Sequence, residues 1–115
     1  MPSLTTTHRQ FGAISIVDLR GSLGLGEGSV TLRRAIRELV ESGRIKIILN
    51  FREVDFIDSA GVGELLGAYL PVKSIGGRLK FLNPTKKVYG VLQITGLDKV
   101  FEVYTDEQAA IRSFS

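Results

Sequence analysis

The residues of this chain whose types and spacing best suit a chemical role stand together. They form the segment Phe56-Ile57-Asp58-Ser59-Ala60-Gly61-Val62-Gly63. An apolar start followed by small residues predicts a strand that runs directly into a helix, with Ser59 at or within the helix N-terminus beside free backbone N–H groups. A phosphate on Ser59 would gain those donors and the positive end of the helix dipole, whereas Asp55 and Asp58 would repel it. Ser59 is therefore a candidate phosphorylation site, and the alternative is that Ser59 or Asp58 only caps the helix.

Catalytic chemistry is largely excluded by residues that the sequence lacks. A serine nucleophile elbow needs glycine two positions before and two after the serine, and here Gly61 is present but position 57 is Ile. The single histidine, His8, lies in a Thr-rich stretch where we expect a solvated side chain, so no Ser-His-Asp set can be assembled. The absence of cysteine excludes disulfides, a thiol nucleophile and a zinc site built on sulfur. We therefore expect no enzyme, no cofactor and no metal.

A flexible loop is predicted for residues 20–28, because four of these nine residues are glycine. Its place between a strand and a helix is typical of phosphate-binding loops. However, it lacks Gly-Lys-Ser/Thr, Ser29 stands where the dinucleotide motif has Gly or Ala, and Glu27 would repel a phosphate. We interpret it as a connection or a partner-binding loop, with nucleotide or small-ligand binding as an alternative that calorimetry would test.

Composition and charge indicate one globular domain over residues 1–115, with 1–10 as a frayed end or an edge strand. The chain is 43% hydrophobic and 23% charged, which is ordinary for a domain of this size. The net charge of +3 is evenly spread, and Arg33, Arg34 and Arg37 are interpreted as a solvated helix face, so no nucleic-acid partner is expected. No apolar run approaches the ~20 residues of a membrane helix, and the N-terminus has no signal pattern. We expect no membrane insertion and a cytoplasmic location.

Strands alternate with helices along the chain, which implies a largely parallel sheet with helices packed on it. The predicted strands are residues 13–19, 45–51, 79–82 and 100–104, with a short apolar lead-in at 54–57. The fold class is α/β: a mixed, mostly parallel sheet of four to five strands with about four helices. An exposed Phe11 or a strand edge would support a dimer, but the sequence favours no oligomeric state.

Capping residues and helix breakers bound the four predicted helices. The first runs from an N-cap at Ser29 to about Ser42. The second begins within 58–61 and is expected to kink or end near Leu70, because Pro71 cannot donate to the helix. The third is capped by Thr85 and ends at Gly96. Thr105 and Gln108 fit a capping box for the last helix, 106–114.

The segment around Ser59 resembles the core of STAS domains, the family of bacterial anti-sigma factor antagonists. The family pattern is an apolar strand, then Asp-Ser-Ser/Thr/Ala-Gly-Leu/Val-Gly, then an apolar helix, and here the motif is Asp58-Ser59-Ala60-Gly61-Val62-Gly63. The resemblance extends over nearly the whole chain. It includes the stretches 21–23, 47–51, 76–83, 96–101 and 106–110.

The resemblance implies a STAS-type fold and a regulatory switch. In such proteins, the serine after the Asp is phosphorylated by a partner kinase that is also the anti-sigma factor. The unphosphorylated form binds that kinase and frees the sigma factor, the phosphorylated form releases it, and a serine phosphatase resets the switch. Carried to this chain, Ser59 is the phosphate acceptor. The residues implied in partner binding are Gly21, Ser22, Leu23, Gly24, Glu27, Asp58, Ala60, Gly61, Val62 and Gly63.

The chain departs from the family pattern at two positions. The family often has Asp directly after Gly-x-Leu, where this chain has Gly24, and Glu27 is a candidate substitute. The central strand of the family usually ends in Asp, where this chain has Asn50, which would lower the charge near Ser59. Both departures favour an alternative role, a non-switching STAS scaffold or a subunit of a signalling complex or membrane transport system.

Overall fold

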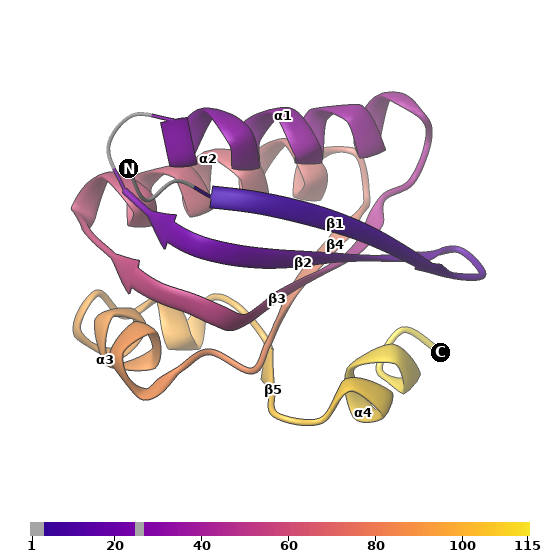
Figure 1. The fold of residues 1–115 in the computed structure, drawn as a ribbon. Helices are drawn as coiled ribbons and strands as arrows, with labels where there is room; N and C mark the ends of the chain where they lie inside the picture. Colours follow the sequence, from indigo (N-terminus) through magenta and orange to yellow (C-terminus); the bar gives the residue numbers. More distant parts are fainter. Residues whose placement is uncertain (1–3, 25–26) are drawn as a thin grey trace.

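The computed structural model describes residues 4–24 and 27–115, without the side chains of residues 27–29. Five strands and four α-helices make up the described fold (Figure 1). The strands are β1 (Leu4–Phe11), β2 (Ile14–Leu23), β3 (Lys46–Ile57), β4 (Arg78–Leu82) and β5 (Val103–Tyr104). The helices are α1 (Glu27–Glu41), α2 (Ser59–Ser74), α3 (Lys86–Ile94) and α4 (Glu107–Arg112), with a short 3-10 helix, η1 (Leu97–Lys99), before β5.

The five strands form one mixed sheet in the order β1-β2-β3-β4-β5. β1 pairs antiparallel with β2, and the other neighbours pair in parallel. The predicted α/β class and the mostly parallel sheet are therefore confirmed. Parallel pairing matters for the site, because β2 and β3 then end at the same edge, where Leu23 is the ladder partner of Ile57.

α1 and α2 lie side by side over one face of the sheet, and α4 lies on the other face (Figure 1). In α1 the residues Leu32, Ile36 and Leu39 recur at helical spacing and are buried, whereas the predicted basic face is exposed. In β3 the run Ile47, Ile48, Leu49 is wholly buried, as expected for a central strand with helices on both faces.

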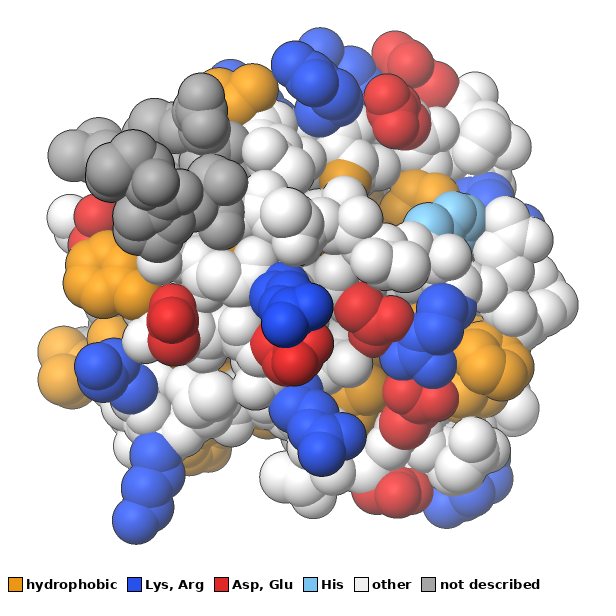
Figure 2. Space-filling model, in the orientation of Figure 1, with side chains coloured by type: hydrophobic (Ala, Val, Ile, Leu, Met, Phe, Trp, Pro, Cys, Tyr) orange, Lys and Arg blue, Asp and Glu red, His pale blue; other side chains and the backbone are white. Residues whose placement is uncertain are grey.

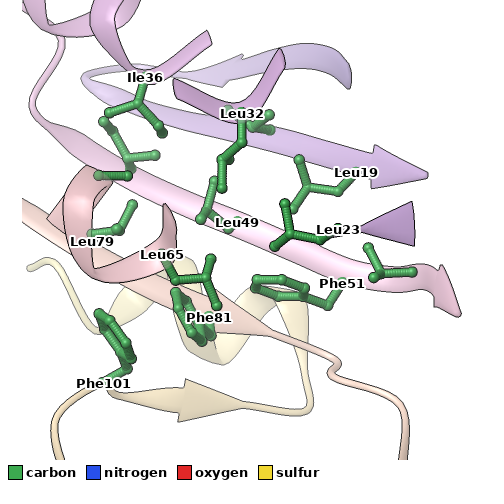
Figure 3. Packing of buried hydrophobic residues seen from close by; sticks show 14 of the residues in the cluster. Leu19, Leu23, Leu32, Ile36, Leu49, Phe51, Leu65, Leu79, Phe81 and Phe101 are labelled. Atoms are coloured by element: carbon green, nitrogen blue, oxygen red, sulfur yellow. The ribbon is translucent and has the colours of Figure 1, made fainter. Parts of the chain in front are cut away.

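The main core lies between the sheet and α1, α2 and α3 (Figure 3). At its centre Phe51 and Phe81 have ring centroids 4.8 Å apart, and Phe81 stacks on Phe101 at 4.3 Å. Such aromatic pairs bury large apolar surfaces and fix the packing of neighbouring elements. A smaller cluster under α4 contains Ile16, Ile48, Leu82 and Ala110.

Polar contacts hold α4 against the sheet. Arg9 of β1 donates from Nε to Asp18 Oδ2 at 2.6 Å and from Nη2 to Glu107 Oε1 at 2.8 Å. Burial alone would raise the pKa of Asp18, but hydrogen bonds from Arg9 and Asn50 and the charge of Arg9 outweigh it, so the pKa lies below its ordinary value. At the other end of α4, the buried Lys80 donates to Ser113 Oγ at 2.8 Å.

Several predicted strand boundaries are wrong, and pairing explains each difference. Residues 4–11 are not among these differences: they form a full edge strand, one of the two alternatives expected for residues 1–10, although their polar side chains give no apolar pattern. Residues 20–23 continue β2 instead of opening a loop, and β3 continues through Arg52 and Glu53, because β-bulges keep the two strands paired. The predicted strand 100–104 is reduced to β5, since η1 and the turn after it take up the preceding residues.

The predicted starts of two helices are also wrong, and α2 does not end at Pro71, which was one of the two effects expected of that proline. α1 begins at Glu27, so Ser29 lies inside the helix and not at its cap. α2 continues through Pro71 to Ser74, because Pro71 and Gly67, whose carbonyl loses its partner, both face solvent. The N-cap of α4 is Asp106 and not Thr105. The predicted cap of α3 at Thr85 is confirmed by its bond from the Val88 N–H.

Candidate functional site

Ser59 is the first residue of α2, directly after the N-cap Asp58. Asp58 has extended backbone, and its Oδ1 accepts a hydrogen bond from the Gly61 N–H at 2.9 Å. Asp58 therefore does the capping that the sequence left open between the two residues. The Ser59 side chain is exposed, and no hydrogen bond from its hydroxyl occurs among the residues that the structure describes.

Gly61 allows the helix start to touch the end of β2. A Cβ at Gly61 would overlap the backbone oxygen of Leu23 and would lie 2.9 Å from Cγ1 of Ile57. Real Cβ atoms do not approach other heavy atoms so closely, so only glycine fits. The Asp58 N–H also donates to the Leu23 oxygen, at 3.4 Å. Gly63, the other glycine of the motif that begins at Asp58, is exposed and has open space around it.

Gly24 lies against the capping carboxylate. A Cβ at this position would be 2.8 Å from Asp58 Oδ2, and Gly24 is buried. Any larger residue there would have to displace the Asp58 side chain. The departure from the family pattern at Gly24 is thus next to the N-cap of α2, within the same cluster as Ser59.

Asn50 is remote from Ser59, which corrects the expectation that it lowers the charge there. Asn50 lies in the middle of β3, seven residues before its end, which is roughly 20 Å along a strand. Its Nδ2 donates to Asp18 Oδ1 at 2.7 Å on the face that α4 covers. Asn50 therefore belongs to the polar contacts around Arg9.

Surface residues beside Ser59 come from β2, β3 and α2. Ser22 Oγ donates to Asp55 Oδ1 at 3.4 Å, and Ser22 is the ladder partner of Phe56. Ala60 and Val62 are half-buried. Gly21 lies in β2 opposite Val54, with a positive φ of 113° that favours glycine.

The structure brings together most of the residues that the sequence selected, but not all of them. Leu23, Gly24, Asp58 and Gly61 are in mutual contact at the end of the β2–β3 pair. Glu27 begins α1, and its side chain lies outside the described part of the chain, as do the whole of Leu25 and Gly26 at the centre of the predicted loop.

Sequence reasoning missed two features near Ser59. Phe56 is 45% exposed, although it stands in an apolar run, because the bulges in the β2–β3 ladder break the two-residue alternation. Arg33 Nε donates to Glu64 Oε1 at 2.8 Å and joins α1 to α2 one turn beyond Ser59. The sequence places Glu64 five residues after Ser59 on the same predicted helix. Its pairing with Arg33 of α1, however, depends on how the two helices pack.

Charges are mixed on the face of the molecule that Figure 2 shows. In the view of Figure 2, acidic and basic side chains are interspersed and form no single basic patch. Within residues 4–24 and 27–115, no group of three metal-ligating side chains comes together, and His8 is an exposed residue of β1. No helix in these ranges has the length and apolar character needed to cross a bilayer.

Similarity to known proteins extends over nearly the whole chain and points to one family. The STAS domain family matches residues 6–110. The anti-sigma F factor antagonist of Lysinibacillus sphaericus is 34% identical over 82 residues, which are 70% of each chain. The TM1081 homolog of Thermotoga neapolitana is 34% identical over 67 residues, which are 58% of this chain and 59% of that protein.

Solved structures of one antagonist superpose on the whole fold. The anti-sigma factor antagonist SpoIIAA in its unphosphorylated form is 29% identical, with a TM-score of 0.78 over 95% of this chain and 96% of that chain. SpoIIAA of Bacillus in its phosphorylated form is 26% identical, with a TM-score of 0.75 over 96% of this chain and 100% of that chain.

Proposed function

The chain belongs to the STAS domain family, and we propose that it is an anti-sigma factor antagonist switched by phosphorylation of Ser59. In its unphosphorylated form it binds an anti-sigma factor that is also a serine kinase, and the sigma factor is freed. Phosphorylation of Ser59 by that kinase releases the chain, and a serine phosphatase restores it. The antagonists named among its relatives support the role, and the environment of Ser59 supports the switch.

The observation that carries this proposal is the division of labour between Asp58 and Ser59. Asp58 satisfies the Gly61 N–H, so the helix start does not depend on the Ser59 hydroxyl. The hydroxyl is exposed at the first position of α2 and available to a kinase. A phosphate there would leave the cap intact, and the positive end of the helix dipole would stabilise it.

The fold already tolerates an anion at the corresponding position of another helix. Glu107 is the first residue of α4, directly after the N-cap Asp106, and its carboxylate is part of the native contacts with Arg9. A phosphoserine at Ser59 would add about −1.5 to −2 charges beside the Asp58 carboxylate. The expected result is a folded protein with a changed surface, and SpoIIAA has the same overall fold in both of its forms.

Small side chains around Ser59 explain why such a charge change would act on a partner. Ala60 and Gly63 add little bulk beside Ser59, so a partner surface can approach the start of α2 closely. A dianion at the centre of such a contact is desolvated and meets like charges, so it lowers the affinity without refolding either protein.

A capture experiment in lysate of the host bacterium tests the proposal. Immobilised wild type, Ser59→Ala and Ser59→Asp are compared, with Thr105→Asp as a control that adds a carboxylate before α4, away from the start of α2 (Figure 1). We expect wild type, Ser59→Ala and Thr105→Asp to retain one serine kinase that Ser59→Asp does not retain. With ATP, the captured kinase should place one phosphate on wild type, at Ser59.

The non-switching scaffold gives the opposite pattern. All four chains would then retain the same proteins, which would be transporter subunits or other STAS chains, and ATP would leave Ser59 unmodified. That result would contradict the switch and would reduce Ser59 to an exposed residue next to the cap.

A further inference from the structure

An apolar hollow lies between α1 and α2, on the outer side of the two helices. Its volume is about 220 Å³. Its apolar walls are formed by Ile36, Val40, Gly67, Ala68 and Pro71. We call this hollow the α1–α2 groove. It is smaller than the roughly 300–1,000 Å³ typical of small-molecule sites, and its size suits one or two aliphatic side chains of a docked segment.

The α1–α2 groove exists because α2 carries no bulky side chain where it faces outward next to α1. Gly67 is exposed, and a Cβ built on it would meet nothing within 4 Å. Ala68 is buried and short, and together with the buried Ile36 it forms the floor of the groove. Leu70, which is 59% exposed, lies about 60° around the helix from Gly67 and widens the apolar surface beyond the groove.

Charge at the groove has one sign. Arg33 and Arg37 line it, both are exposed, and no acidic residue is among the lining residues. Arg33 is paired with Glu64 at 2.8 Å, so Arg37 supplies the net positive charge at this edge. An occupant that buries apolar side chains in the groove is therefore complemented best by a carboxylate.

The groove lies within reach of a partner that contacts the surface around Ser59. Gly67 follows Ser59 by eight residues on the same helix, which is about 12 Å along the axis and about 80° around it. The Arg33–Glu64 pair lies between them. A partner that contacts the start of α2 can thus extend over the groove without leaving α2.

We propose that the α1–α2 groove docks an amphipathic helix of the anti-sigma factor kinase, with aliphatic side chains over Gly67 and a carboxylate facing Arg37. This inference rests on the proposed function, because it assigns the occupant to the same partner. The groove contact would not involve Ser59, and alone it would be too weak to hold the partner once Ser59 is phosphorylated. It would add affinity to both the binding and the phosphorylation steps.

Two substitutions test the groove without touching Ser59. Gly67→Leu fills the hollow, and its control is Gly90→Leu on α3, where a Cβ also meets nothing within 4 Å. Arg37→Glu reverses the charge, and its control is Arg34→Glu, which is exposed on α1 but does not line the groove. Thermal unfolding of each variant confirms folding, and replacing glycine in a helix is not expected to lower the midpoint.

The affinity of each variant is measured by calorimetry with the purified kinase retained by the wild-type chain. We expect Gly67→Leu and Arg37→Glu to weaken binding by about tenfold or more, as for central interface residues, and both controls to stay within about twofold of wild type. Wild-type affinity in both groove variants, with loss of binding in Ser59→Asp, would overturn the groove and leave the switch standing. Weakened groove variants with no effect of Ser59→Asp would support the groove and contradict the switch.

Discussion

Helices α2 and α4 begin with the same cap but expose different chemistry. Asp58 and Asp106 both have extended backbone, and each accepts a hydrogen bond from the N–H three residues later, at 2.9 Å. The residue after the cap is Ser59 in α2 and Glu107 in α4. Glu107 is held by Arg9 of β1, whereas Ser59 is exposed.

The difference shows that an aspartate cap alone does not mark a functional site. In α4 the cap and the residue after it both serve the fold, since they attach the helix to the sheet. In α2 the cap serves the fold, and the next residue is left for a partner. A second difference is the residue whose N–H donates to the cap. In α2 it is Gly61, which lies against the backbone of Leu23, and in α4 it is Ala109.

The largest loss of stability is expected from a substitution of Gly61, the residue whose N–H donates to the cap of α2. Gly61→Ala forces a Cβ onto the Leu23 oxygen, and we expect it to lower the free energy of unfolding by about 2–3 kcal/mol. Gly63→Ala, which meets open space, should be neutral or stabilising by up to about 1 kcal/mol. Urea unfolding of both variants checks this. Equal stabilities would show that the close contact of α2 with β2 is not required.

Removal of either cap should cost less and should affect both helices. Asp58→Ala and Asp106→Ala each lose the bond from one backbone N–H, and we expect a loss of about 1 kcal/mol in each. Only Asp58→Ala should also weaken kinase binding, because only α2 carries the proposed site. The comparison fails if Asp106→Ala impairs binding to the same extent.

Acid should weaken the polar contacts of α4 through Asp18. The pKa of Asp18 is lowered in the folded protein, so its carboxylate stabilises the fold above the unfolded value of about 4, and this contribution is lost as the pH falls through the folded pKa. Arg9→Gln should cost about 0.5–1 kcal/mol at pH 7 and should reduce the further loss between pH 7 and pH 3. The exposed Arg112→Gln is the control, and a wild-type acid response in Arg9→Gln would contradict this assignment.

The smallest effect on stability is expected at Ser59 itself. Ser59→Asp places a carboxylate at the start of α2, where attraction by the helix dipole is offset by repulsion from Asp58, so the free energy of unfolding should change by less than about 0.5 kcal/mol. Thr105→Asp before α4 should behave alike. A loss above 2 kcal/mol in Ser59→Asp would mean that a negative charge there unfolds the helix start, and release of the partner would then need another explanation.

Much of the fold was predictable because its signals are local. The apolar run 45–51, the Thr85 cap and the motif that begins at Asp58 each depend on neighbouring residues, and the structure places all three as expected. The position of Ser59 at a helix start followed from the same local reasoning. Its exposure, however, depends on Asp58 taking over the cap, and the sequence allowed either residue to do so.

The features that were missed depend on contacts between distant segments. β1 has few apolar residues, so the sequence left a frayed end and an edge strand as alternatives for residues 1–10, and the pairing with β2 decides between them. The exposure of Phe56 follows from bulges in the β2–β3 ladder, and Pro71 is tolerated because Gly67 faces solvent. The close contact of Gly61 with Leu23 joins residues 38 positions apart in the sequence, and no local pattern reports it.

The most direct test of the switch compares one protein in two states against one partner. The chain is phosphorylated by the purified kinase, the single modification at Ser59 is verified by mass spectrometry, and affinities of the two forms are measured by calorimetry. We expect the phosphorylated form to bind at least about a hundredfold more weakly while its unfolding midpoint stays unchanged. Equal affinity of the two forms would contradict the account, and so would a loss of binding that occurs only because the phosphorylated chain unfolds.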